Sequence, residues 1–399
     1  MTSVKRLTSR IAALASAPLP PEMLVPELLI ALQNAIGTDA ILPAVLVHDA
    51  GMGPVHEFVV WRGSEFSDAV RGLLRAGIWP APSTIPSVQK LMSERLSRSV
   101  FAAPLWGEGC AEDGPWAPLW RDRNVRHGYY LAAFAPSGRV CVALMSRGST
   151  SPAFTAADIA LGEATARLIA RAVDARPVAL LPCDTLVAEV PLAFSVDGTL
   201  GTIGVGGPEL LRDLGAGGSE ASAKGREIVE QAAARFRDSI LAESAEALQR
   251  LPVGPYLVGG PEDEAAFRRG NFTLMQDTRT RRPRTIQLVQ HEQGAFELKV
   301  AASNSVDTGG MQVLGTLRRR VPRLLTVVRG LVELAAPGRE IELAMQLCAG
   351  VSLPDAAHAL GMSPTSAKTL VSRLASRVGT TGQERVVDAL AQVGCSVLR

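Results

Sequence analysis

The chain of 399 residues has few cysteines, few lysines and no long apolar run. Its five cysteines lie far apart and form no C-x-x-C pair, which argues against a zinc ribbon and a disulfide framework and makes a reducing cytoplasm the expected compartment. No uncharged apolar stretch reaches the roughly 18 residues that a membrane-spanning helix needs. We therefore expect a cytoplasmic protein with no membrane segment and no signal peptide.

Signatures of catalysis and of metal binding are also missing. The five histidines form no H-E-x-x-H motif and do not pair with cysteines. No G-x-S-x-G motif, no phosphate-binding loop with its lysine and no G-x-G-x-x-G before a helix occurs. We expect no enzyme activity, no metal and no cofactor.

The charge of the whole chain gives no attraction to nucleic acid. Lysine and arginine number 41 against 39 aspartates and glutamates, a formal net charge of +2, and only five of the basic residues are lysines. Nucleic-acid binding usually shows as a strongly basic domain. A sum over several domains can hide a local patch, however, and a chain of this length with 47% hydrophobic residues is expected to fold into two to four domains.

Residues 1–176 have the pattern of helices and strands expected of a small α/β domain. Leucines and isoleucines at helical spacing predict an amphipathic helix over 21–36, and strand patterns follow at 41–48 and 55–62. Two further strands flank a tight turn at 136–138, and Thr155 with Asp158 can cap a last helix that runs to about Asp174. This order resembles a GAF domain. The resemblance implies a sensor fold whose pocket could be lined by aromatic residues, although such residues are more often core: Trp106, Trp116, Trp120, Tyr129 and Tyr130.

Residues 186–318 repeat a strand-rich pattern with a helical middle. A hairpin around Asp197 and Gly198 is followed by a helical region over 221–251 and by strand candidates at 285–291, 295–302 and 311–317. This stretch resembles a PAS domain with an enlarged helical part. GAF and PAS folds are both sensor folds with antiparallel sheets, so the resemblance is compatible with a small-molecule ligand in a sensor domain and does not say what is sensed.

A linker helix is predicted over 319–335, in a stretch rich in arginine. Five arginines between 315 and 330, with no acidic residue among them, could neutralise phosphates, and their alternative role is a solvated surface or contact with acidic residues of a neighbouring domain. We call them the linker arginines: Arg318, Arg319, Arg320, Arg323 and Arg329.

The last stretch, 336–399, carries the most specific pattern in the chain. Three short helical runs each end at a glycine, at Gly350, Gly361 and Gly379, as helix ends in the left-handed conformation require. Ser352 and Ser363 stand where they can cap the second and third helices. The third helix has a small apolar spine with short polar or basic side chains around it, which suits the major groove of DNA.

The pattern R-E-x-E-L, A-x-x-L-G-x-S-P and V-S-R-L, within 339–379, resembles the LuxR-type helix-turn-helix. The resemblance implies that Lys368 and Arg373 contact phosphates and that Thr365 and Thr369 face the groove. It also implies a fourth helix over 383–392, which serves for dimerisation in that family. A helical hairpin used only for packing is the alternative interpretation. The expected DNA-binding residues are Thr365, Ser366, Lys368, Thr369, Ser372, Arg373 and Arg377.

The sequence thus predicts a multidomain protein: two α/β (α+β) sensor domains with antiparallel sheets, a linker helix and an all-α four-helix DNA-binding domain. The favoured function is that of a one-component bacterial transcription regulator that binds double-stranded DNA as a homodimer. The alternative is a co-regulator that works mainly by docking on RNA polymerase or on a partner regulator, because the terminal module is nearly neutral and Leu370 replaces the family's usual histidine.

Overall fold

A computed structural model gives mixed α/β structure with two antiparallel sheets and a helical C-terminal region. By compactness the chain divides into two units, residues 1–185 with 321–399, and residues 186–320. Both ends of the chain belong to the first unit. The structure describes residues 2–38, 40–48, 55–59, 99–107, 117–122, 124–137, 139–174, 181–195, 198–215, 221–250, 283–291, 294–304, 311–381 and 385–398.

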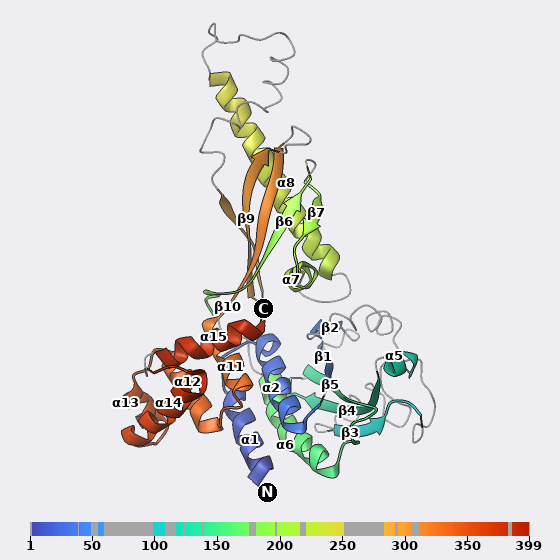
Figure 1. Cartoon of the computed structure of the whole chain (residues 1–399), viewed down its shortest axis with the longest axis vertical. Helices are drawn as coiled ribbons and strands as arrows, with labels where there is room; N and C mark the ends of the chain where they lie inside the picture. Colours follow the sequence, from blue (N-terminus) through green and yellow to red (C-terminus); the bar gives the residue numbers. More distant parts are fainter. Residues whose placement is uncertain are drawn as a thin grey trace. The chain divides into compact units, whose positions relative to one another are not determined.

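The first unit contains a sheet of five strands in the order β2-β1-β5-β4-β3 (Figure 1). All its neighbouring pairs are antiparallel, including the predicted hairpin of β4 and β5. Strand β3 was not among the sequence's predictions. The bounds are β1 Ala40–His48, β2 Val55–Val59, β3 Ser99–Pro104, β4 Val125–Phe134 and β5 Arg139–Gly148.

Helices α1, α2 and α6 pack against one another in this unit, and α6 also packs on the sheet. The predicted helix at 21–36 is confirmed, and α6 begins where Thr155 and Asp158 cap it reciprocally: the Thr155 amide donates to Asp158 Oδ2 (2.8 Å) and the Asp158 amide to Thr155 Oγ1 (3.2 Å). The bounds are α1 Thr2–Ala15, α2 Pro21–Ile36, α5 Ala117–Asp122 and α6 Ala156–Asp174.

The second unit has a sheet of five strands in the order β7-β6-β10-β9-β8. When the strands of each sheet are numbered along the chain, both sheets have the order second, first, fifth, fourth, third. Its core joins the sheet to two helices, with Phe194, Phe296 and Leu298 from the strands and Val229 and Phe236 from α8. The bounds are β6 Thr185–Phe194, β7 Leu200–Ile203, α7 Gly207–Leu214, α8 Ala221–Arg250, β8 Arg284–His291, β9 Gly294–Asn304 and β10 Met311–Val321.

The linker helix predicted over 319–335 is shorter than expected. Strand β10 continues to Val321 because Arg318, Arg319 and Arg320 pair in register with β9, and the helix α11 spans Arg323–Glu333. Pro322 separates the two elements, since its ring fixes φ and it has no amide to donate. Along α11 the residues from Leu325 to Val332 are all buried, so this helix is part of the core of the first unit.

In the described part of the C-terminal stretch four helices follow α11, as the sequence predicts. Helix α12 spans Gly338–Cys348, α13 Leu353–Ala359, α14 Pro364–Val378 and α15 Val386–Leu398. The first residues of the predicted fourth helix, 383–384, lie outside the described residues, and the helix continues past the predicted end at 392. Helix α12 packs on α1, and α11 packs on α2, α12 and α15 (Figure 1).

Candidate nucleic-acid interface

Helices α13 and α14 begin and end as the sequence predicts. The Ser352 hydroxyl accepts from the Asp355 amide (3.3 Å) and the Ser363 hydroxyl from the Ser366 amide (3.1 Å), so both helices have serine N-caps. Gly350, Gly361 and Gly379 have φ of +80°, +62° and +71°. Each helix is therefore closed by a residue that adopts the left-handed conformation without strain.

The buried face of α14 is small. Ala367, Val371 and Leu374 are at most 1% exposed, as predicted, while Val378 is only half-buried. They pack with α12 and α13, where Ala356 and Ala357 are fully buried. Alanine side chains at these contacts let α12, α13 and α14 approach closely. Because this face of α14 is buried, the opposite face is the exposed one.

All seven predicted DNA-binding residues lie on exposed positions of α14. Neither Lys368 nor Arg373 forms an ion pair with any residue that the structure describes. Thr369 donates its hydroxyl to the Thr365 carbonyl (3.0 Å), and the Ser366 and Ser363 hydroxyls lie 2.9 Å apart. The outer face of α14 thus combines three cations, Lys368, Arg373 and Arg377, with hydroxyl groups and carries no acidic residue.

Arg377 differs from the other two cations of α14. Its Nη1 lies 3.0 Å from Oε2 of Glu340, whose side chain is 2% exposed. Burial raises the pKa of Glu340, and the charges of Arg377 and Arg373 oppose that rise. Arg377 therefore links α14 to α12 through an ion pair that the sequence did not indicate. Contact of Arg377 with phosphate stays a prediction.

The linker arginines do not form a free basic patch. Arg318 pairs with Glu189 (3.1 Å) and Glu297 (3.7 Å), Arg319 with Asp213 (2.7 Å), and Arg320 with Glu297 (3.3 Å). Arg323 pairs with Asp388, and Arg329 with Glu27. The structure therefore shows the alternative role predicted from the sequence, which is contact with acidic residues. A carboxylate distant in sequence pairs with each of the five arginines.

Helix α15 is packed on α11 through its apolar face, which includes the buried Val386, Leu390 and Ala391. Two glycines bring the backbones together: a Cβ on Gly330 would lie 2.2 Å from the Leu390 carbonyl oxygen, and one on Gly394 would lie 1.9 Å from that of Thr326. Helix α11 covers this apolar face of α15, and a role of the predicted fourth helix in dimerisation stays a prediction.

The N-terminal helices hold the C-terminal helices in place. Arg329 of α11 forms a buried ion pair with Glu27 of α2, and Arg10 of α1 donates to the Val332 carbonyl (2.5 Å). Gly338, at the start of α12, lies so close to α1 that a Cβ there would be 2.5 Å from Ser9 Oγ. Leu7, Ile11 and Leu14 recur at helical spacing, a pattern that predicts α1, and all three are at most 5% exposed.

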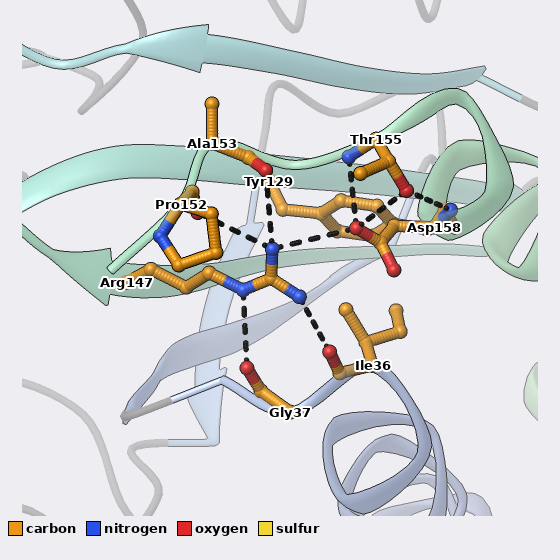
Figure 2. A network of polar contacts seen from close by, with 8 residues as sticks. All are labelled: Ile36, Gly37, Tyr129, Arg147, Pro152, Ala153, Thr155 and Asp158. Atoms are coloured by element: carbon orange, nitrogen blue, oxygen red, sulfur yellow. Dashed lines mark hydrogen bonds and ion pairs between the residues drawn. The ribbon is translucent and has the colours of Figure 1, made fainter.

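The polar network at the sheet of the first unit is structural. Figure 2 shows Arg147 reaching three segments: it donates to the carbonyls of Ile36 and Gly37 at the end of α2 and to those of Pro152 and Ala153, and it pairs with Asp158 (3.4 Å). Its guanidinium also lies 4.3 Å from the centre of the Phe154 ring. Through these contacts within its own unit, Arg147 connects α2, β5 and α6.

The aromatic residues considered for a sensor pocket lie mostly in the core. Trp120, Tyr129 and Tyr130 are at most 4% exposed, and Trp106 donates from Nε1 to the Val125 carbonyl (2.6 Å). Trp116 lies outside the described residues. Among the residues that the structure describes, no group of three histidine, cysteine, aspartate or glutamate side chains is arranged to hold a metal ion, and no helix is long and apolar enough to cross a membrane.

No family model matches the chain, and neither the curated proteins nor the solved structures contain a match to it.

Proposed function

We propose that the protein is a cytoplasmic, one-component bacterial transcription regulator that binds double-stranded DNA through α14. One observation carries this proposal: the exposed face of α14 bears Lys368, Arg373 and several hydroxyls, it has no acid, and the opposite face is an alanine-rich spine buried on α12 and α13. A helix seated in this way can enter the major groove, where basic side chains contact phosphates and short polar ones read base edges.

The two five-stranded sheets support a sensor role for the rest of the chain. Both are antiparallel and have the same strand order, as two related GAF-like and PAS-like sensor modules would have. We propose that a signal reaches α14 through α12, because α12 packs both on α1 and against α14.

Homodimerisation on a two-fold operator remains part of the proposal. Since α11 covers the apolar face of α15, the dimer would use another surface, or α15 would have to leave α11 first. Sedimentation of the full chain with and without operator DNA distinguishes a monomer from a dimer.

The proposal is tested by selecting bound fragments from a random double-stranded DNA pool with the full-length protein. We expect one enriched sequence, and we expect Thr369→Ala to relax its selectivity at one or two positions. Ser396→Ala, an exposed hydroxyl of α15, is the matched control. Recovery of no preferred sequence would contradict the proposal.

A second function, docking on RNA polymerase or on a partner regulator, is favoured by the local electrostatics. The linker arginines and Arg377 are all paired with carboxylates, so among the described cations of α14 and of the linker arginines only Lys368 and Arg373 have no ion-pair partner. Co-purification of polymerase with the protein, together with no enriched DNA sequence, would support this function over the first.

A further inference from the structure

Thr369 lies at the centre of the exposed face of α14. Successive residues of a helix are about 100° apart around its axis, which places Thr369 nearly opposite the buried side chains of Ala367, Val371 and Leu374. Thr369 is itself exposed. When the outer face of α14 enters a groove of DNA, Thr369 is therefore among the residues that come closest to the bases.

The neighbours of Thr369 on this face let the helix approach base edges. Thr365 lies one turn before it and Ser372 one turn after it, and both side chains are short and exposed. Lys368 and Arg373 lie on opposite sides of Thr369, about 100° and about 40° away around the helix axis. Cations on the two sides suit the two phosphate backbones that border the major groove, with Thr369 between them over the bases.

The hydroxyl of Thr369 is already engaged within the helix. It donates to the Thr365 carbonyl oxygen over a distance of 3.0 Å. A hydroxyl has a single proton, so this one cannot at the same time donate to a base acceptor such as guanine O6, guanine N7 or thymine O4. The side chain can then meet a base only with its methyl group or with a hydroxyl oxygen that accepts.

The methyl group of Thr369 is turned away from this hydrogen bond. Oγ1 and Cγ2 are bonded to the same Cβ and lie about 120° apart around the Cα–Cβ bond, and branching at Cβ makes the side chain stiff. Because Oγ1 is held against the Thr365 carbonyl, the direction of Cγ2 is fixed as well. The matching apolar group in the major groove is the 5-methyl group of thymine, which threonine methyl groups contact.

We propose that Thr369 recognises a thymine through contact between its Cγ2 methyl group and the 5-methyl group of the base, while its hydroxyl bonds only within the helix. The inference rests on the proposed function, because it names the base that the exposed face of α14 selects. Lys368 and Arg373 contribute affinity for every sequence through phosphate contacts. Thr369 adds a preference for thymine at one position of the site.

The test starts from the sequence that the full-length protein enriches from a random DNA pool. Each thymine of that duplex is replaced singly by deoxyuridine, which pairs with adenine in the same way and lacks only the 5-methyl group. We expect one thymine, or a symmetry-related pair in a two-fold site, whose replacement weakens binding about fourfold, the effect of exposing one methyl-sized group. Replacement of thymines outside the enriched sequence is the control on the DNA.

Two variants of Thr369 separate the methyl group from the hydroxyl. Thr369→Val keeps a methyl group on a branched Cβ and removes the hydroxyl, and it should retain the preference for thymine over uracil. Thr369→Ser keeps the hydroxyl and removes the methyl group, so it should bind the thymine duplex about fourfold more weakly and not distinguish thymine from uracil. Thr202→Ser, at an exposed position of β7, is the matched control and should bind as the unchanged chain does.

The opposite result for the two variants would overturn the inference: a preference that Thr369→Ser retains and Thr369→Val loses would mean that the hydroxyl reads the base. Equal binding of the unchanged chain to all the uracil duplexes would also overturn it. The selection separates the inference from the proposed function. An enriched sequence without such a thymine contradicts the inference alone, and recovery of no enriched sequence contradicts both.

Discussion

Arg329 and Glu27, 302 positions apart in the sequence, form an ion pair with 2.9 Å between Nη1 and Oε2, and both side chains are 2% exposed. The pair joins α11 to α2, and so fixes the C-terminal helices to the N-terminal ones inside one unit. Arg329 also has Glu333 of its own helix at 3.5 Å.

Removing one partner of this pair should destabilise the first unit strongly. Glu27→Gln leaves the Arg329 charge buried without its main counter-charge, which costs about 3–5 kcal/mol in the free energy of unfolding. All five tryptophans lie between 61 and 120, so the urea transition of tryptophan fluorescence reports on the first unit. The double variant Glu27→Leu with Arg329→Met should recover most of the loss.

Asp388→Asn is the control for this measurement, because it breaks the exposed pair with Arg323, at 68% and 44% exposure. Exposed pairs contribute about 0–1 kcal/mol. If Glu27→Gln were no more destabilising than Asp388→Asn, the buried pair would not hold the two parts together.

Because α11 and α15 cross closely, one added methyl group at the crossing should lower the free energy of unfolding. Gly394→Ala places a Cβ against the Thr326 carbonyl, so the helices must separate, at a cost of about 1–3 kcal/mol in the free energy of unfolding. Gln392→Ala, on the exposed face of α15, should be neutral or slightly stabilising because alanine favours helix. Hydrogen exchange of the α15 amides locates the change, and equal protection in the two variants would contradict the close crossing.

The Arg147 network predicts that charge alone cannot replace the guanidinium. Arg147→Lys keeps the charge, but an ammonium cannot reach four carbonyls and Asp158 together, and we expect a loss of about 2–3 kcal/mol. Arg171→Lys, at an exposed position of α6, is the matched control and should change the free energy of unfolding by less than about 0.5 kcal/mol. Equal urea midpoints for Arg147→Lys and Arg171→Lys would contradict a role of the Arg147 guanidinium in connecting α2, β5 and α6.

The buried carboxylate of Glu340 predicts a particular pH dependence of stability. Its pKa in the folded protein is raised by burial, so between the ordinary glutamate pKa and this raised value the folded state holds more protons than the unfolded state. Stability from this group is full below the ordinary pKa and is lost as the pH rises through the raised one. Glu340→Gln should remove that loss.

The measurement for Glu340 is the difference in urea stability between the unchanged chain and Glu340→Gln from pH 4 to pH 7. The difference should move in favour of the glutamine variant as the pH rises. A difference that moves the other way would mean that the charges of Arg377 and Arg373 outweigh burial and that the pKa is lowered.

The C-terminal helices could be predicted in detail because their signals are local. Ser352, Ser363 and the three glycines act on the backbone within a few residues, and the spacing of Ala367, Val371 and Leu374 sets the buried face of α14 by helix geometry alone. The exposure of Lys368 and Arg373 follows from the same spacing.

What could not be predicted depends on partners distant in sequence. An arginine run has the same sequence pattern whether it contacts phosphate or carboxylate, and Arg319 and Asp213 come within 2.7 Å of each other only in the folded second unit. Similarly, Gly330 and Gly394 reveal a helix crossing only when α11 and α15 are placed side by side. The joining of both chain ends in one unit arises from such contacts and has no local signature.

The proposed binding of DNA by α14 through Lys368 and Arg373 is tested most directly by the salt dependence of affinity. Lys368→Ala should weaken binding to every DNA sequence and reduce the slope of log K against log salt by about 1, since one phosphate contact is lost. Lys224→Ala, an exposed lysine of α8, is the matched control and should leave the slope unchanged. An equal slope for Lys368→Ala and the unchanged chain would contradict the claim.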